Sequence, residues 1–372
     1  MKGIECIELR KFITEYKQKN EKNEFKPVAV GKYGIRTRES IYSKELAKDY
    51  SKNKIIFKNT LTVGMGSRQI DIGILTDDVI YSVSPAYHTY KISGINADYL
   101  RYCLMCRNED MFKRFVKRGS RQGKSIDLKR WLEYEIPVYD VCNQEKIVLK
   151  LNKVTNVISM RKQQLQKLDE LIQARFVELF GNESNPKAWE IVNVESVADV
   201  QVGVVIKPSQ YYTDAIDGIK AFRSLNVGEG FIKDENWVYF TKEGHKKNAK
   251  SVLKENDLLI VRSGAPGTAC VVTKEYEGCN AIDIIIAHPN CEKVNPYYLC
   301  AYTNMPHGKK QINEGTGGAA QQHFNVTKYN KLQLMLPPMK LQDEFVTFVN
   351  QVNKSKLVIK NLLQIYKHQI QM

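Results

Sequence analysis

The sequence has no apolar run long enough to cross a membrane as a helix. Such a helix needs roughly 18 or more consecutive apolar residues, whereas the longest run here, AIDIIIA at 281–287, has the length of a buried strand. The beginning of the chain, MKGIECIELRKF, is interrupted by charged residues and contains no apolar segment typical of a secretion signal. We therefore expect a cytoplasmic protein with no membrane partner.

Cysteine and histidine are also sparse. Eight cysteines among 372 residues are too few for a disulfide scaffold. Cys103 and Cys106 form a CxxC pair, but the pair lies in a segment that reads as a helix, with no second pair or nearby His to complete a zinc site. None of the six histidines has another at i+3 or i+4. We expect reduced cysteines, no metal site and no cofactor in this chain.

Basic residues, by contrast, are in excess. The 56 Lys and Arg residues outnumber the 41 Asp and Glu residues, which gives a formal net charge of +15. This excess suggests a polyanionic partner such as nucleic acid, although a solvated surface would explain it equally well. The charge is uneven, with +9 in residues 1–140, zero in residues 183–335, and +3 each in residues 141–182 and 336–372.

The most informative pattern is an internal repeat with a period near 200 residues. Several segments recur in one order with nearly constant spacing, and the period is too long for a solenoid. The chain therefore consists of two copies of one unit, each a globular part followed by a long helix. The matched segments are IECIELRKFI (4–13) with WEIVNVESVA (189–198), VGKYGI (30–35) with VGEGFI (227–232), INADYL (95–100) with VNPYYL (294–299), IDLKRWLEYEIP (126–137) with VTKYNKLQLMLP (326–337), and Gln122 with Gln322.

Within each globular part, the pattern predicts short strands followed by a helix. Runs rich in Val, Ile, Phe and Tyr alternate with Gly, Asn and Asp, as strands and turns require. Helices are expected over 96–117 and over 295–311. Strands grouped ahead of a helix favour an α+β fold, here two similar mixed α/β domains. The expected strands are KPVAV, KIIF, QIDIGIL and DVIYSV in the first copy, and IKAF, WVYF, DLLIVR, ACVVT and AIDIII in the second.

Each copy ends in a helix whose apolar residues recur at alternating spacings of four and three. This period is typical of a coiled-coil seam. A homodimer stalk would show the same pattern, but one chain holds both helices, so we favour intrachain pairing. The helices run antiparallel if the copies are related by a pseudo-two-fold axis. The seam comprises Ile147, Leu151, Val154, Ile158, Leu165, Leu168 and Ile172, and Phe345, Val349, Val352, Ile359, Leu363, Tyr366 and Ile370, with Arg161 and Arg175 adding charge.

These patterns together define four segments. The first domain occupies residues 1–140 and its helix residues 141–182. The second domain occupies residues 183–335 and its helix residues 336–372. The two domains are thus separated by two long helices that form an antiparallel coiled coil.

Two short motifs suggest an enzyme. Asn295-Pro296-Tyr297-Tyr298 looks like the amino-methyltransferase signature, but Asn-Pro is also an ordinary helix start, and no Gly-rich methyl-donor loop is evident. Gly123-Lys124-Ser125 ends a segment that has Arg118 where a phosphate-binding loop needs glycine. No Ser/His/Asp arrangement is persuasive either. We therefore expect a protein without a catalytic centre, and a DNA amino-methyltransferase using Asn295 to Tyr298 is the alternative.

Three segments carry a resemblance to a known family. The family is the specificity (S) subunits of type I restriction-modification systems. Its central region resembles KLDELIQARFVELFGN (167–182), and the closing segment of its recognition domain resembles GTGGAAQQHFNVTKY (315–329). Its C-terminal region resembles LMLPPMKLQDEFVTFVNQVNKSK (334–356). The tandem layout extends the resemblance over essentially the whole chain. The first domain departs from the pattern in lacking a counterpart to Trp189.

The resemblance implies a non-catalytic subunit of a host-defence complex that directs DNA methylation. Each domain would be a target-recognition domain that reads one half of a bipartite, asymmetric site in double-stranded DNA, and the helices would set the spacer. Two methyltransferase (modification) subunits would dock on the helices, and restriction (endonuclease and translocase) subunits would join them. S-adenosylmethionine, ATP and Mg would bind only to those partners.

The candidate DNA contacts are polar residues in loops after strands and near the closing Gly loop. Arg suits the O6 and N7 atoms of guanine, while Gln and Asn suit adenine. A coiled-coil adaptor that ignores DNA is a further alternative, which steep salt dependence of DNA binding would exclude. The candidates are Lys32, Tyr33, Arg36, Arg38, Arg68, Arg118, Arg121 and Lys124 in the first domain, and Lys207, Arg223, Asn226, Arg262, Gln321, Gln322 and His323 in the second.

Overall fold

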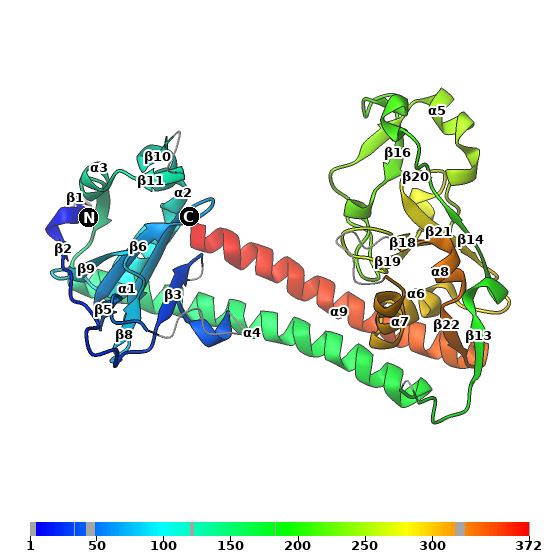
Figure 1. The fold of residues 1–372 in the computed structure, drawn as a ribbon, viewed down its shortest axis with the longest axis horizontal. Helices are drawn as coiled ribbons and strands as arrows, with labels where there is room; N and C mark the ends of the chain where they lie inside the picture. Colours follow the sequence, from blue (N-terminus) through cyan, green and yellow to red (C-terminus); the bar gives the residue numbers. More distant parts are fainter. Residues whose placement is uncertain are drawn as a thin grey trace. The chain divides into compact units, whose positions relative to one another are not determined.

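The computed structural model forms two compact units. Unit 1 comprises residues 1–162 with residues 361–372, and unit 2 comprises residues 163–360. Each unit holds one globular domain and a part of both long helices, α4 (Val141–Phe180) and α9 (Met339–Gln371) (Figure 1). The structure describes residues 5–32, 34–41, 49–119, 123–182, 184–316 and 324–371.

Unit 1 is built on one four-stranded antiparallel sheet in the order β2-β9-β6-β7. The first and last strands of the domain, β1 and β12, pair separately, as do β3–β4, β5–β8 and β10–β11. Its elements are β1 (Glu5–Glu8), η1 (Leu9–Lys11), β2 (Ile13–Glu15), β3 (Val28–Gly31), β4 (Gly34–Thr37), η2 (Arg38–Ser40), β5 (Lys54–Ile56), β6 (Thr60–Met65), β7 (Ile70–Leu75), β8 (Tyr81–Val83), β9 (His88–Ile92), α1 (Ala97–Cys106), α2 (Asn108–Phe115), β10 (Val116–Gly119), β11 (Gly123–Ile126), α3 (Leu128–Leu132) and β12 (Glu135–Val138).

Unit 2 has the same plan with an additional four-stranded sheet. Its main sheet has the order β14-β21-β18-β19, β13 pairs with β22, and a second sheet has the order β15-β17-β16-β20. Its elements are β13 (Glu190–Asn193), η3 (Val194–Ser196), β14 (Ala198–Val202), η4 (Pro208–Tyr211), β15 (Tyr212–Thr213), β16 (Ile219–Phe222), η5 (Ser224–Asn226), β17 (Val238–Phe240), α5 (Lys242–Lys247), η6 (Ala249–Ser251), β18 (Leu258–Val261), β19 (Ala269–Val271), η7 (Lys274–Tyr276), β20 (Asn280–Ala281), β21 (Ile284–Pro289), α6 (Pro296–Asn304), α7 (Pro306–Thr316), α8 (Val326–Asn330) and β22 (Gln333–Leu336).

The predicted repeat is confirmed by the two sheet topologies. The order β2-β9-β6-β7 corresponds strand for strand to β14-β21-β18-β19, and β1–β12 corresponds to β13–β22. The matched segments near residues 30 and 227 form the same turn, because Val30 pairs with Ile35 and Val227 with Ile232, both antiparallel. The prediction of two similar mixed α/β domains is therefore correct.

The alignment of the closing segments, however, was wrong by two residues. The sequence match set 126–137 against 326–337, an offset of 200, whereas α3 and α8, like β12 and β22, are related by an offset of 198. The matching prolines misled the alignment. Pro137 lies inside β12 opposite Cys6, while Pro337 follows the end of β22. A proline can sit in β12 because this strand has a partner on one side only.

The predicted helices at 96–117 and 295–311 are each broken into two. The side chain of Asn108, at the start of α2, accepts a hydrogen bond from the Ile70 N–H (3.0 Å) and donates one to the Ile70 carbonyl (2.8 Å). Asn304, at the end of α6, makes the same pair of bonds with Ala269 (3.0 and 2.8 Å). Each break thus fixes the first residue of the outer strand, β7 or β19, through a long-range contact.

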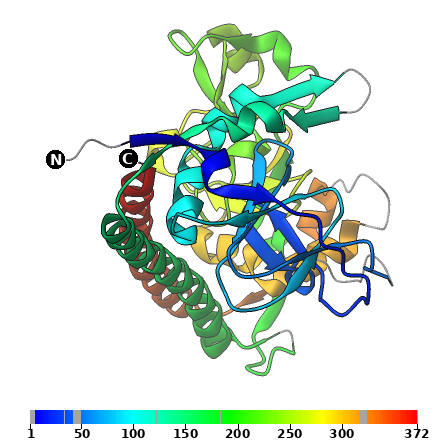
Figure 2. The same cartoon turned by 90° about the vertical axis from the view of Figure 1, so that its left-hand side faces the viewer.

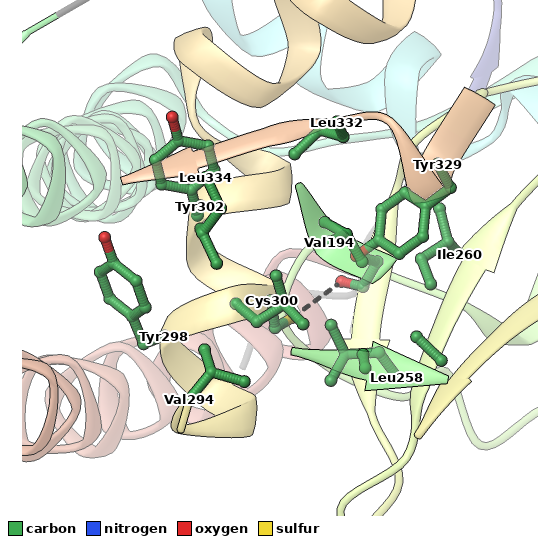
Figure 3. Packing of buried hydrophobic residues seen from close by; sticks show 14 of the residues in the cluster. Val194, Leu258, Ile260, Val294, Tyr298, Cys300, Tyr302, Tyr329, Leu332 and Leu334 are labelled. Carbon is green, nitrogen blue, oxygen red and sulfur yellow. Dashed lines mark hydrogen bonds between the residues drawn. The ribbon is translucent and has the colours of Figure 1, made fainter. Parts of the chain in front are cut away.

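Each unit has its own apolar core. In unit 1, α1 lies between the sheet and α4 (Figure 2). The Tyr102 hydroxyl of α1 donates to the Asn152 side chain of α4 at 2.6 Å. Trp131 of α3 is fully buried in the same core. In unit 2, side chains of α6 gather with Leu258 and Ile260 of β18 (Figure 3). Burial of these residues is the main stabilising contribution to each unit.

The long helices pair as a coiled coil, and within unit 2 the pairing is antiparallel. Two ion pairs link α4 to α9 there: Arg175 with Glu344 and Lys356 with Asp169, both at 2.5 Å. The lower-numbered partner on α4 meets the higher-numbered partner on α9, as antiparallel helices require. Every predicted seam residue is half-buried or buried except Ile370, whose side chain lies outside the described part of the chain.

Candidate DNA-reading surfaces

In the first domain, one group of predicted contacts gathers at the β10–β11 hairpin. The Lys124 ammonium donates to the Ser67 carbonyl (2.5 Å) in the β6–β7 turn, next to exposed Arg68. In the hairpin register, Arg118 pairs with Lys124. The structure thus brings Arg68 and Lys124 together from distant parts of the sequence. The side chain of Arg118 and the whole of Arg121 lie outside the described residues.

A second group lies at the β3–β4 hairpin. Lys32 is in its turn, Arg36 is on β4 and Arg38 opens η2, and both Lys32 and Arg36 are exposed. The hairpin rests on β7, so closely that a Cβ at Gly73 would meet the side chains of Ile35 and Val30. Tyr33, predicted with this group, lies outside the described residues.

Arg38 has the most defined surroundings of these cations. Its guanidinium lies 5.2 Å from the centre of the Tyr50 ring, which supports it from one side. It lines a cavity of about 290 Å³ together with Met65, Ser84 and Tyr87. Its Nε is buried and has no hydrogen-bond partner among the described residues. An arginine held in this way suits the fixed geometry of a guanine contact. Sequence reasoning missed Ser84 and Tyr87, which belong to a turn with no basic residue.

In the second domain, Lys207 and Arg223 are placed differently. Lys207 is exposed and adopts a left-handed backbone conformation (φ 40°) before η4, a strained conformation for a residue with a side chain. Arg223 is half-buried and donates to the Asn236 carbonyl at 2.6 Å. Both therefore remain candidate contacts at the surface.

Two predictions in the second domain require revision. Asn226 is fully buried, because its side chain accepts from the Arg223 N–H (2.9 Å) and donates to the Glu235 carbonyl (2.8 Å). The prediction that Asn226 contacts DNA was therefore wrong. Arg262 forms an ion pair with Asp283 and donates to the Phe324 carbonyl (3.3 Å), so its guanidinium already holds the domain together. Gln321, Gln322 and His323 lie outside the described residues.

The methyltransferase-like motif has a structural role. The Asn295 side chain caps α6 by accepting from the N–H groups of Tyr297 (2.9 Å) and Tyr298 (3.4 Å), and it donates to Asp343 (2.8 Å). Tyr298 is fully buried, which raises the pKa of its phenol well above the ordinary value, and its hydroxyl donates to the Met335 carbonyl. Asn96 caps α1 in the same way, so the motif is one copy of a repeated cap.

Other chemistry is limited in the described part of the chain. All eight cysteines are free, and burial raises the pKa of Cys270 to about 12 and of Cys279 to about 11. No cluster of three or more His, Cys, Asp or Glu side chains could hold a metal ion within the described ranges. Among the same residues, no helix is long and apolar enough to span a membrane.

The structure thus consists of two domains with the same order of four strands in the main sheet. A family model described as the type I restriction modification DNA specificity domain matches residues 7–170 and again residues 186–365. Each match covers one copy of the repeat. The chain therefore belongs to the family of type I restriction-modification DNA specificity domains.

Two curated relatives share part of this chain. The type I restriction enzyme MjaVIII specificity subunit of Methanocaldococcus jannaschii is 24% identical over 148 residues, which is 36% of this chain and 34% of the relative. The type I restriction enzyme EcoBI specificity subunit of Escherichia coli is 20% identical over 167 residues, which is 45% of this chain and 35% of the relative. The matches thus span about a third of each relative's length.

Two solved structures share the fold along the whole chain. A chain described in a study of complex assembly in a type I R-M system is 15% identical, with a TM-score of 0.58, over 100% of this chain and 96% of the other. The type I restriction-modification S subunit of M. genitalium is 12% identical, with a TM-score of 0.55, over 100% of this chain and 95% of the other. At these identities the likeness concerns the fold.

Proposed function

We propose that this chain is the DNA sequence-specificity subunit of a type I restriction-modification complex. The observation that carries the proposal is the double match of the family to two copies of one scaffold. Two equivalent domains in one chain are suited to reading the two halves of a bipartite DNA site. Because their surface residues differ, the halves would differ in sequence and the site would be asymmetric.

The proposed division of labour rests on the side chains. Exposed Arg68 and Lys124 would position the duplex through its phosphates, while Arg38 would read a base edge. The long helices would set the spacer between the two half-sites. The chain itself would be non-catalytic, since Asn295 of the methyltransferase-like motif is occupied in capping α6.

The partners would cover the outer faces of the helices. Large apolar side chains off the seam stay exposed there, including Met160 at 63% and Leu357 at 59%. Exposed apolar side chains of this kind mark protein interaction sites when they are contiguous. We propose that two modification subunits dock on the helices and restriction subunits join them in the cytoplasm. S-adenosylmethionine, ATP and Mg would bind to those subunits.

The test is a binding measurement on the full chain co-produced with its modification subunits. The methylome of cells carrying both gives the candidate site, and duplexes with both half-sites, either half-site or neither are then compared. We expect the duplex with both halves to bind about 10³-fold or more tightly than random DNA at physiological salt. Equal binding to all duplexes would contradict the proposal.

Two controls separate the alternatives. If the isolated chain bound S-adenosylmethionine, the methyltransferase alternative would gain support. If the complex formed but its DNA affinity did not fall with added salt, the adaptor alternative would be favoured. A specificity subunit should fail the first test and show a steep salt dependence in the second.

A further inference from the structure

One glutamine occupies the same place in both units. Gln144 is the fourth residue of α4, and Gln342 is the fourth residue of α9. They are 2% and 0% exposed, and they are the only fully buried polar residues among the described residues of the two helices. A buried amide is retained only where both its donor and its acceptor find partners.

Each of these amides joins three segments of its unit. The Gln144 oxygen accepts from the Asn96 N–H (2.9 Å), and its nitrogen donates to the Tyr139 carbonyl (2.7 Å). Gln342 does the same with the Asn295 N–H (2.8 Å) and the Pro337 carbonyl (2.8 Å). Each glutamine therefore links the start of the long helix to the cap of α1 or α6 and to the chain that leaves the closing strand. We call this pair of bonds the glutamine clasp.

A second bond runs beside each clasp. The Tyr99 hydroxyl donates to the Pro137 carbonyl, and the Tyr298 hydroxyl donates to the Met335 carbonyl, both at 2.8 Å. The first turn of α1 or α6 is thereby held on β12 or β22. In unit 1 these bonds fix the start of α4 to α1 and β12. In unit 2 they fix the start of α9 to α6 and β22, at nearly identical distances.

The clasps fix the orientation of each long helix on its domain, which apolar packing alone does not. Beyond the clasp, α4 packs on its domain through Ile147 and Val148, and α9 packs through Phe345. Apolar contacts are non-directional and tolerate a small rotation of a helix, whereas a hydrogen bond weakens steeply when its angle changes. Two opposed bonds from one buried amide leave little freedom in the angle at which the helix leaves the domain.

We propose that the glutamine clasps fix this exit angle and so determine which spacing between half-sites the protein accepts. Gln144 and Gln342 are thus positioning residues that touch no DNA. The inference rests on the proposed function, since a spacing matters only if both domains read DNA. One added base pair rotates one half-site by about 34° and shifts it by about 3.4 Å relative to the other. A fixed exit angle resists such a displacement, and a loosened one accommodates it.

The test uses the full chain with its modification subunits and the variants Gln144→Met and Gln342→Met. Affinity is measured for duplexes with the native spacer and with spacers one base pair longer or shorter. Methionine has a similar volume and lacks both hydrogen bonds. We expect the ratio of the affinity for the native spacer to the affinity for the altered spacers to fall about tenfold in each variant, because a loosened exit angle accommodates the altered spacers. Gln163→Met on α4 and Gln351→Met on α9, both exposed glutamines, are the matched controls and should keep the preference.

The outcomes separate the inference from the proposed function. If the variants kept the wild-type preference, or lost affinity equally for all spacers, the clasps would be structural only and the inference would be wrong. If the wild-type complex itself showed no preference for two half-sites, the proposed function would fail, and the inference with it. If the methionine variant of one clasp does not fold, the methionine variant of the other clasp, which removes the equivalent pair of bonds, carries the same test.

Discussion

The two domains share a scaffold but differ in what they place on it. Both have the same order of four strands, the same pairing of first and last strand, and the same clasp. The first domain carries +9 and a basic hairpin at β10–β11, whereas the second is neutral and bears the sheet β15-β17-β16-β20. The shared residues hold each domain on its long helix, and the differing residues give the two domains different surfaces.

The largest expected difference between the domains is in the stability that each gains by packing against its long helix. Phe345 is fully buried among aromatic rings, including Phe176 at 5.5 Å, while Ile147, at the equivalent position, is half-buried. Phe345→Ala should lower the free energy of unfolding of unit 2 by about 3–5 kcal/mol, and Ile147→Ala that of unit 1 by about 1–2 kcal/mol. Hydrogen exchange resolved by unit measures both. Equal losses would remove this difference between the domains.

The next effect concerns base reading by the first domain. Arg38→Ala should reduce discrimination at one base pair by about 1–3 kcal/mol and leave the salt dependence of binding unchanged. The reason is that a base contact carries sequence information and a phosphate contact does not. Site selection from a random duplex pool measures it, with the exposed Lys22→Ala as control. If the salt dependence weakened while the selected sequence stayed the same, Arg38 would be a phosphate contact.

Substitution of the helix caps Asn96 and Asn295 tests whether either domain takes part in methyl transfer. Asn96→Ala and Asn295→Ala should each lower the free energy of unfolding by about 0.5–2 kcal/mol, since both remove a helix cap. DNA methylation by the complex should fall only as far as the folded fraction falls, and to the same extent for both. A selective loss of methylation in Asn295→Ala at full folding would revive the methyltransferase alternative.

Charge should separate the domains in non-specific binding. Replacing Arg68 and Lys124 with Gln should lower the slope of log affinity against log salt by about 2, close to 0.9 per lost phosphate contact. Replacing Lys207 and Arg223 with Gln should lower it by less than about 1, because the second domain has no net charge. Titrations on random duplex DNA at several salt concentrations give both slopes. Equal slopes would contradict the prediction that the first domain provides most of the non-specific affinity for DNA.

The smallest expected effect is a difference in acid sensitivity. Asp127 caps α3, while the neutral amide of Asn325 caps α8 at the equivalent position. The Lys117 ammonium, hydrogen-bonded to Asp127, lowers the pKa of this carboxyl below its ordinary value of 3.8. Its contribution to stability is therefore full above that value and is lost as the pH falls through the folded pKa. Hydrogen exchange in α3, but not in α8, should rise in acid, and Asp127→Asn should abolish the difference.

Local patterns predicted much of the fold. The coiled-coil seam followed from the alternating spacing of apolar residues, which is a property of neighbouring residues. The breaks after Cys106 and Asn304 did not, because each depends on an Asn that bonds a strand more than 30 residues away in the sequence. The β10–β11 hairpin is not among the predicted strands either.

The candidate contacts were predictable only as residue types. Arg and Asn after strands are candidates in any DNA reader, but the sequence does not show which of them the fold uses internally. Asn226 and Arg223 stand three residues apart, yet Asn226 is buried in backbone hydrogen bonds and Arg223 reaches the surface. Burial of a polar side chain is decided by tertiary structure, which is why this distinction needed the structure.

The difference in residue number between matched positions shows where the two copies differ in length. It is 185 at the first matched strand, 197 at the hairpin near residues 30 and 227, and 198 at the clasp glutamines. Nearly all the difference in length between the copies therefore arises before that hairpin. A longer loop costs little entropy, so that stretch can accept insertions freely. The two sides of each clasp are spaced alike, since Asn96 precedes Gln144 by 48 residues and Asn295 precedes Gln342 by 47, so a change in length upstream leaves both clasps in place.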